Sequence, residues 1–349
     1  MKQPFYKAPA LWLVVLLIST GAAMAQESRI GTNAASELLV PVGARYIGLG
    51  GSSIAAVQGI EAIYWNPAGL SRTTHSANAM FSQMRHISDI NVSYVAVSAT
   101  FSGLGTFGLS IKSLDVGEII VTTEESPDGT GAIINPQFVT TGLTYSRALS
   151  DRVSVGATFN LISESIDRVG ASGFAFDAGV QYSNVGQITG LSLGVAVKNL
   201  GPAMQYDGTG LFRTSQPNGV DRGSTPLQVV AQKDELPTTL EIGMAYAVPF
   251  GTKSKFDLTT MYQDNNFLDD VSRFGVEYSY NETFFLRGGY NLSPDAPKDA
   301  VGEDSYIYGL TLGAGFHYEL PNIAMDFNYA YRDLAFFDGS HVFSIALGF

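Results

Sequence analysis

The sequence predicts a transmembrane antiparallel β-barrel of about 14 strands, preceded by an N-terminal segment that lacks the strand pattern. Three observations lead to this fold class: the pattern of the last strand, its repetition along the chain, and the alternation of short and long connections. After the N-terminal leader, no apolar run reaches the ~18 residues that a membrane helix needs. A membrane protein without such a run satisfies its backbone hydrogen bonds by closing a sheet into a barrel.

The last strand is predicted at residues 341–349, where the side chains alternate with a period of two. Large apolar residues occupy every second position up to the terminus, at Phe343, Ile345, Leu347 and Phe349. A strand with one wholly apolar face needs lipid or protein to cover it, and about nine residues cross an outer membrane at a tilt. The terminal aromatic resembles that of outer-membrane barrels, and we interpret Phe349 as an outer-membrane assembly signal.

The same alternation recurs along the chain. Between Val153 and Leu161, for example, large apolar residues alternate with small and polar ones. In the segment near residue 310 the rule places Tyr306 and Tyr308 on the outward face. The opposite faces predict a polar lumen. The segments begin near Asn78, Ile90, Thr106, Gln137, Val153, Phe174, Leu191, Thr238, Lys255, Ser272, Phe284, Tyr306, Ile323 and His341.

The connections between these segments alternate in length. Short turns such as 102–105 and 150–152 alternate with long loops such as 115–136 and 200–237. Short periplasmic turns and longer extracellular loops are typical of bacterial barrels, and this alternation favours a membrane barrel over a soluble β-sandwich. The longest loop, 200–237, is the leading candidate for contact with a partner, because long loops in compact folds are often functional.

The N-terminal sequence predicts the cellular compartment of the protein, and the net charge restricts its partners. Residues 1–25 read as a secretory signal with Lys2 and Lys7 before a short apolar run, and cleavage is expected near Ala25. We therefore expect three parts: a signal peptide (1–25), an N-terminal hatch or plug segment (26–75) and an outer-membrane barrel (76–349). The net charge of −12 and the absence of a basic stripe argue against a nucleic-acid partner.

Residues 31–72 do not alternate and form a separate element. Glycines at 48, 50 and 51 permit a tight turn, and Asn66-Pro67 is a turn initiator. Because this segment precedes the first strand, we expect it to fill the barrel or to cover its periplasmic mouth. A nucleotide-binding interpretation of the glycines lacks the flanking strand and helix that such a site requires.

The motifs of this segment resemble the N-terminal signature of the PorV/PorQ family, which belongs to the wider group of barrels similar to the FadL fatty-acid channel. The resemblance implies about 14 strands, an N-terminal hatch and residence in the Gram-negative outer membrane. It covers residues 31–72 by motif and the rest of the mature chain by strand count and terminal Phe. The matching hatch positions are Gly43, Arg45, Gly48, Gly50, Gly51, Asn66, Pro67, Ala68, Gly69 and Leu70.

The resemblance further implies a role in the type IX secretion system. A PorV-like barrel takes secreted cargo through its C-terminal domain from the translocon and hands it to the surface sortase, whereas a PorQ-like barrel holds a component of the attachment complex. The hatch residues would be structural: Arg45 would pair with a lumen acid such as Asp326, because a buried arginine without a partner is costly.

Three other function classes can be compared with a secretion barrel: a channel, a purely structural barrel and an enzyme. A FadL-like channel for long-chain fatty acids or other hydrophobic small molecules needs an apolar pocket, and the predicted polar lumen argues against one, although Ile47, Leu49, Ile54 and Ile63 of the hatch could line it. A purely structural barrel is a third interpretation. An enzyme is not expected, because none of the histidines (His75, His86, His317 and His341) lies in a catalytic motif or at metal-ligand spacing. No cofactor is predicted.

Overall fold

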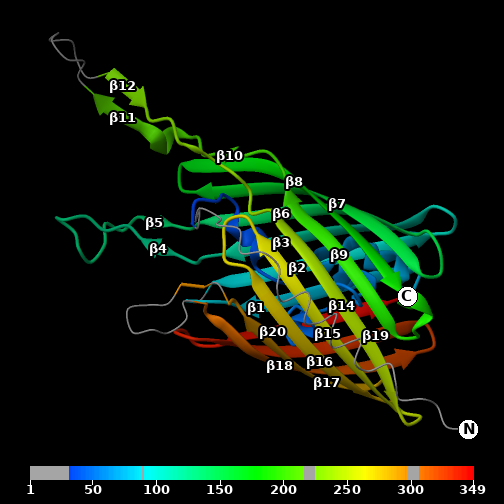
Figure 1. Cartoon of the computed structure of the whole chain (residues 1–349). Helices are drawn as coiled ribbons and strands as arrows, with labels where there is room; N and C mark the ends of the chain where they lie inside the picture. Colours follow the sequence, from blue (N-terminus) through cyan, green and yellow to red (C-terminus); the bar gives the residue numbers. More distant parts are fainter. Residues whose placement is uncertain (1–30, 89, 216–224, 295, 298–305) are drawn as a thin grey trace, which may run out of the picture.

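A closed antiparallel barrel dominates the structure, a computed structural model that describes residues 31–349 apart from 89, 216–224, 295 and 298–305 (Figure 1). In this part of the chain the barrel has fourteen strands, and pairing of the first with the last closes it. The strands are β1 (Ala77–Arg85), β2 (Asn91–Phe101), β3 (Gly105–Asp115), β6 (Gln137–Ala148), β7 (Val153–Ile166), β8 (Val169–Ser183), β9 (Leu191–Leu200), β14 (Thr239–Phe250), β15 (Ser254–Asn265), β16 (Val271–Tyr280), β17 (Phe284–Leu292), β18 (Tyr308–Leu320), β19 (Ile323–Leu334) and β20 (Ser340–Gly348).

The predicted fold class and strand count are confirmed, and all but one of the strands begin within two residues of the predicted start. The exception is β8, which begins at Val169 rather than near Phe174. A tight turn at Asp167, with a φ of 52°, joins β7 directly to β8. Both strands therefore extend beyond the apolar segments from which they were predicted.

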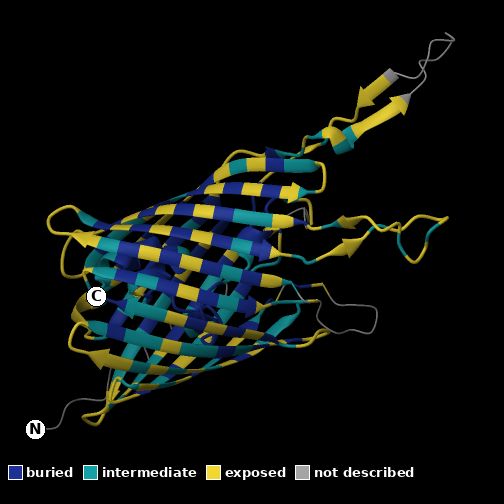
Figure 2. Cartoon of the chain, turned by 180° about the vertical axis from the view of Figure 1, so that it is seen from behind, coloured by how far each residue is buried: buried dark blue, intermediate teal, exposed yellow. Residues whose placement is uncertain are grey.

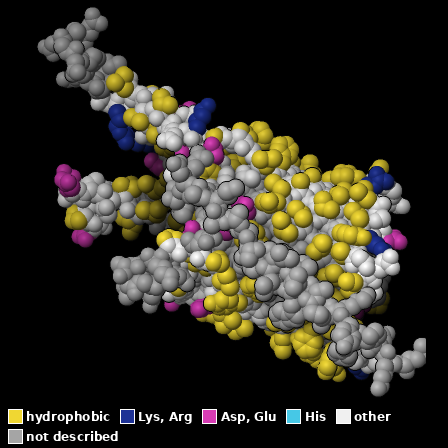
Figure 3. Space-filling view, viewed as in Figure 1, with side chains coloured by type: hydrophobic (Ala, Val, Ile, Leu, Met, Phe, Trp, Pro, Cys, Tyr) yellow, Lys and Arg dark blue, Asp and Glu magenta, His cyan; other side chains and the backbone are white. Residues whose placement is uncertain are grey.

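The alternation of burial along each strand separates a lipid face from a lumen face (Figure 2). On β7, Leu161 is 53% exposed whereas Ser154 and Thr158 are buried. On β20, Phe343 is 59% exposed and Ser344 is buried. An outer surface covered with large apolar side chains on nearly every strand would be costly in water, and it matches the apolar band that lipid covers in membrane barrels (Figure 3).

The outward placement of Tyr308, and of Tyr306 whose ring packs against it, is wrong. A register shift between Tyr308 and Thr311 interrupts the pairing of β18 with β19. Such a bulge inserts a residue and reverses the side to which the preceding side chains point. The Tyr308 ring therefore lies under the Arg332 guanidinium, with 4.4 Å between the ring centroid and Cζ.

The two ends of the barrel differ in their connections. Short turns, including the one with η4 (Val185–Gln187), gather at the end where the chain terminates, and long excursions leave the other end (Figure 1). Following the rule for bacterial barrels, we call these the periplasmic and extracellular ends. The excursions contain η5 (Thr209–Leu211) and three small sheets: β4 (Ile119–Ile120) with β5 (Ile133–Ile134), β10 (Met204–Gln205) with β13 (Lys233–Asp234), and β11 (Phe212–Ser215) with β12 (Thr225–Gln228).

The N-terminal segment lies inside the barrel, where it forms most of the apolar core (Figure 1). Its elements are η1 (Ser36–Leu39), α2 (Ala44–Ile47), η2 (Gly59–Glu61), α3 (Ala62–Trp65) and η3 (Pro67–Arg72). None of the helices in the described ranges has both the length and the apolarity of a membrane span. The predicted signal and its cleavage site near Ala25 lie outside the described residues.

Candidate functional site: the hatch and the extracellular excursions

Of the predicted hatch segment (26–75), residues 33–72 pack inside the barrel and are called the hatch from here on. They lie against glycines of the barrel wall. At Gly194 on β9 an added Cβ would lie 2.6 Å from the Ala55 Cα, and at Gly275 on β16 it would lie 2.6 Å from the Leu49 carbonyl oxygen. Gly156 on β7 and Gly179 on β8 approach the Asn66-Pro67 turn still more closely, at the Pro67 backbone and the Asn66 side chain respectively. Because these positions carry no side chain, the hatch backbone can pack directly on the backbone of the wall.

Asn66 holds the turn that begins η3. Its side-chain Oδ1 accepts from the Ala68 amide at 3.2 Å, and its Nδ2 donates to the Ile54 carbonyl at 3.0 Å. The same Nδ2 lies 3.3 Å from the Val180 carbonyl of β8. Pro67 occupies the first position of η3, where a missing amide hydrogen costs nothing. Ala68, Gly69 and Leu70 are buried behind it.

The hatch glycines between residues 43 and 51 leave space for side chains and backbone of the barrel wall. Gly43 has a φ of 85° and donates its amide to Ser82 Oγ at 3.3 Å. The carbonyl of Gly48 accepts from Thr311 Oγ1 at 3.2 Å. At Gly50 and Gly51, both with positive φ, an added Cβ would lie 2.7 Å from Asn291 Oδ1 and from Arg273 Nη1, respectively. A side chain at either position would collide with the barrel.

Arg45 belongs to an ion cluster in the periplasmic half of the lumen. Its Nη2 lies 3.2 Å from Glu277 Oε1, and the Nε of Arg287 donates to Glu277 Oε2 at 2.5 Å. The partner of Arg45 is thus Glu277 rather than Asp326, which lies 2.9 Å from His317 Nδ1 instead. One carboxylate on β16 therefore joins the hatch to the wall, and two guanidiniums share it.

Glu61 lies beside this cluster at the end of η2. It is 9% exposed, and its Oε1 is buried with no hydrogen-bond partner. Burial raises the pKa of Glu61 to about 7, although the charges of Arg45 and Arg287 oppose the rise. The hatch therefore carries a carboxyl group that titrates near neutral pH.

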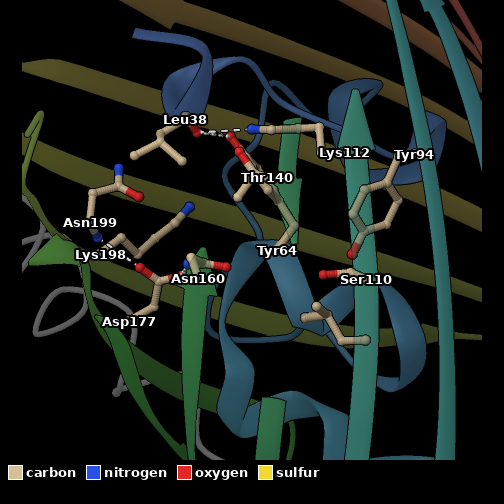
Figure 4. A pocket seen from close by; sticks show the side chains of 11 residues that line it. Leu38, Tyr64, Tyr94, Ser110, Lys112, Thr140, Asn160, Asp177, Lys198 and Asn199 are labelled. Carbon is tan, nitrogen blue, oxygen red and sulfur yellow. Dashed lines mark hydrogen bonds between the residues drawn. The ribbon is translucent and has the colours of Figure 1, made fainter. Parts of the chain in front are cut away.

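Two lysines of the wall hold the extracellular half of the hatch. Lys112 of β3 donates its Nζ to the Glu37 carbonyl at 2.8 Å and to the Leu38 carbonyl at 3.3 Å. Lys198 of β9 lies 3.4 Å from Glu241 Oε1, with its Nζ 4.3 Å from the centroid of the Tyr64 ring. Figure 4 shows both lysines around a cavity of about 30 Å³, which is room for about one water molecule.

The start of the hatch contacts the longest excursion. The amide of Ala34 donates to the Glu235 carbonyl at 3.0 Å. A small apolar cluster joins Ala35 and Leu38 to Met204 and Leu236 of the excursion. The hatch thus spans the lumen from the extracellular excursion to the periplasmic turns, where Arg72 donates to the Arg152 carbonyl at 2.9 Å.

The excursions expose apolar side chains beyond the end of the barrel. The hairpins β4–β5 and β11–β12 project away from it (Figure 1). Acids gather at the tip of the β4–β5 hairpin, where Glu124, Glu125 and Asp128 are found (Figure 3). The exposed apolar residues of the excursions are Ile119, Ile120, Ile133, Phe212, Leu227, Val229 and Val230.

A polar cavity of about 230 Å³ opens between the hatch and the periplasmic end of the wall. Arg45, Gln58 and Arg72 of the hatch and Lys255 and Asp257 of β15 line it. Lys255 Nζ lies 2.8 Å from Asp257 Oδ2. Mixed charges and amides make this cavity suited to water and polar solutes rather than to an alkyl chain.

The described residues contain no group of three or more potential metal ligands. The histidines lie apart: His341 lies 2.8 Å from the Tyr329 hydroxyl on the outer face, and His86 accepts from Arg332 in the lumen. Phe349, the predicted assembly signal, is 50% exposed, and its amide donates to the Ala77 carbonyl at 2.9 Å.

Several residues that hold the hatch were not singled out from sequence. Lys112, Glu241, Glu277 and Arg287 occupy inward positions of strands whose alternation was recognised. A charge at an inward position of a membrane strand is a usable signal, because it needs a partner inside the lumen. The wall glycines also fall on inward positions, yet their purpose becomes visible only with the hatch in place.

The fold and the hatch define an outer-membrane barrel filled by its own N-terminal segment. The model of the family described as type IX secretion system protein PorV matches residues 23–252, about two thirds of the chain, and the chain belongs to this family. No match was found among curated proteins.

Solved barrels share the fold at low identity. The CymD monoaromatic hydrocarbon channel has a TM-score of 0.56 and 14% identity over 89% of this chain and 98% of that one. The Ralstonia pickettii toluene transporter TbuX has a TM-score of 0.55 and 13% identity over 88% and 98%. A Pseudomonas aeruginosa FadL homologue has a TM-score of 0.50 and 12% identity over 88% and 98%. These similarities concern the fold alone.

Proposed function

We propose that this outer-membrane barrel is a cargo-binding platform of the type IX secretion system, which receives secreted proteins by their C-terminal domains and hands them to the surface attachment machinery. The observation behind the proposal is the pair of apolar hairpins that the PorV-family barrel projects from its extracellular end. Its expected partners are the secretion translocon, the cargo C-terminal domains and components of the surface sortase.

The β4–β5 hairpin has the properties of a docking element. Ile119, Ile120 and Ile133 are 47%, 59% and 56% exposed, outside the strands that lipid would cover. Exposed apolar side chains gathered on a projecting element typically mark an interaction site. Each strand of this two-stranded sheet also leaves one edge unpaired, and an extended partner segment could add to it.

The hatch supports a platform rather than a conduit. Its backbone packs directly on the wall glycines Gly194 and Gly275, and Lys112 and Glu277 tie it to opposite halves of the lumen. The inward faces are polar along most strands. A barrel filled in this way displays its loops on a rigid support.

The second candidate is a FadL-like channel for long-chain fatty acids or other hydrophobic small molecules. It is supported by the shared fold with barrels that are themselves channels for monoaromatic hydrocarbons. The polar lining of the periplasmic cavity, with Arg45, Arg72 and Asp257, disfavours an apolar solute along that part of a route.

The test is mass spectrometry of the tagged chain purified from outer membranes in mild detergent, with both protein partners and bound lipids identified. Ile120→Asp should abolish recovery of the translocon, the sortase or proteins with a shared C-terminal domain. Ile188→Asp is the matched control, because Ile188 is 41% exposed at the periplasmic end. A lone barrel with stoichiometric fatty acid would overturn the platform and favour the channel.

A further inference from the structure

Two arginines of the extracellular half of the lumen form no ion pair with any acid in the described part of the chain. Arg332 on β19 is 5% exposed, and its Nη2 lies 3.1 Å from His86 Nδ1. Arg273 on β16 is half-buried and makes no side-chain hydrogen bond or ion pair with another described residue. The Nε atoms of both arginines are buried without an acceptor. Both guanidiniums therefore retain unused donors inside the barrel.

The two arginines face a common region. Tyr306 lies there with its ring centroid 5.6 Å from that of Tyr308, the residue under the Arg332 guanidinium. Burial raises the pKa of Tyr306, and the charges of both Arg273 and Arg332 act against that rise, which places both within electrostatic reach of one hydroxyl. Both cations are therefore within electrostatic reach of the Tyr306–Tyr308 ring pair.

The hatch turn and the adjacent strand close this region. The Nη1 of Arg273 lies against Gly51, and the unpartnered Oδ1 of Asn291 lies against Gly50. Asn291 is the cross-strand neighbour of Arg273 in the pairing of β16 with β17. The positive-φ glycines of the hatch thus define one side of the space in front of the guanidinium.

Among the described residues, no acid forms an ion pair with either arginine, and Glu241, which lies near Tyr64, is paired with Lys198. Burial and the charge of Arg332 lower the pKa of His86 to about 4, so the imidazole is neutral at physiological pH and accepts from Arg332. The other described groups that interact with the two arginines are the phenols of Tyr64, Tyr306 and Tyr308 and the ammonium of Lys198. Buried cations without a counter-charge are costly, and an anion relieves that cost.

We propose that Arg273 and Arg332 form a binding site for a small oxyanion of the carboxylate or phosphate class, in the extracellular half of the lumen between the hatch turn and β16–β19. Guanidinium groups present planar, paired donors that match two oxygens of such an anion. The surrounding groups are phenols, an amide and an imidazole, which favours a small polar oxyanion over the head group of a fatty acid.

The experiment measures thermal unfolding of the full chain in detergent while inorganic phosphate replaces chloride at constant ionic strength. The wild type should show saturable stabilisation by phosphate. Arg273→Gln should weaken the apparent affinity about tenfold, the size of one lost charge-assisted pair. Arg213→Gln removes an exposed extracellular arginine and should leave the affinity unchanged.

Three outcomes would overturn the proposal. Equal phosphate responses in wild type and Arg273→Gln would show that the effect is not at this site. A fatty-acid mass retained by the wild type in native mass spectrometry and lost from Arg273→Gln would identify a lipid carboxylate as the occupant. Phosphate binding gained only after Asp299, Glu303 and Asp304 are changed to amides would show that the chain supplies its own carboxylate.

Discussion

The periplasmic and extracellular halves of the lumen differ in how they treat buried charge and space. In the periplasmic half Arg45 and Arg287 share Glu277, and hatch and wall are in backbone contact at Gly194. In the extracellular half, the contacts of Arg332 within the described residues are a neutral imidazole and an aromatic ring. Lys112 holds the hatch in the extracellular half as well, so the comparison indicates that the halves differ in their arginines: those of the periplasmic half share an acid, whereas Arg332 keeps unused hydrogen-bond donors for a ligand.

The largest expected loss of stability concerns the periplasmic half, where the arginines are paired with an acid. Glu277→Gln removes the carboxylate that Arg45 and Arg287 share, so the buried Arg287 and the half-buried Arg45 both lose this ion pair. We expect a loss of about 3–5 kcal/mol in the free energy of unfolding, measured by urea denaturation of the refolded barrel. Glu319→Gln, an exposed acid at the end of β18, is the control. An equal, small loss in both variants would show that the cluster does not fix the hatch.

A pH series sharpens the same comparison. Because the folded-state pKa of Glu61 is raised to about 7 from 4.5, the hatch should be most stable below pH 4.5 with respect to this group, and should lose stability as pH rises to about 7. The loss is at most about 3 kcal/mol. Hydrogen exchange of residues 44–72 should show it, and Glu61→Gln should remove the dependence. A wild-type profile that persists in this variant would assign it to another group.

Replacement of a wall glycine by alanine tests how closely the hatch packs against the wall in each half of the lumen. Gly194→Ala forces a Cβ to within 2.6 Å of the Ala55 Cα, whereas Gly309 on β18 has no atom within 4 Å of its added Cβ. We expect Gly194→Ala to cost about 1–3 kcal/mol and to increase proteolysis of the hatch. Gly309→Ala should leave proteolysis unchanged. If both variants behave alike, tight seating of the hatch is not a property of the periplasmic half.

The smallest loss of stability is expected for Arg332 in the extracellular half. Arg332→Gln removes a buried cation that no acid compensates, so in a buffer without oxyanions the free energy of unfolding should change by less than about 1 kcal/mol. Urea denaturation beside Glu277→Gln gives the direct contrast. A loss as large as that of Glu277→Gln would mean that Arg332 is itself a structural tie.

Much of the fold could be predicted because a barrel strand alternates with a period of two over its whole length. Phe343, Ile345 and Ser344 were placed on the correct faces from their positions alone. The failure at Tyr308 has a local cause, since a bulge changes the side of a residue without any sequence mark as clear as the alternation itself. The hatch was recognisable by its glycines and by Asn66-Pro67, although the wall residues that it packs against were not.

The sequence by itself determined the strands, their lipid and lumen faces, the alternation of turns and loops, and the existence of a hatch, because these depend on neighbours along one chain segment. Only the tertiary structure decided that Arg45 meets Glu277 rather than Asp326, that the wall glycines receive the hatch backbone, and that Arg332 meets the imidazole of His86. These depend on the stagger of fourteen strands and on where the hatch lies against them. Arg45 and Glu277 are far apart in sequence, and only the packing of the hatch inside the closed barrel brings them together.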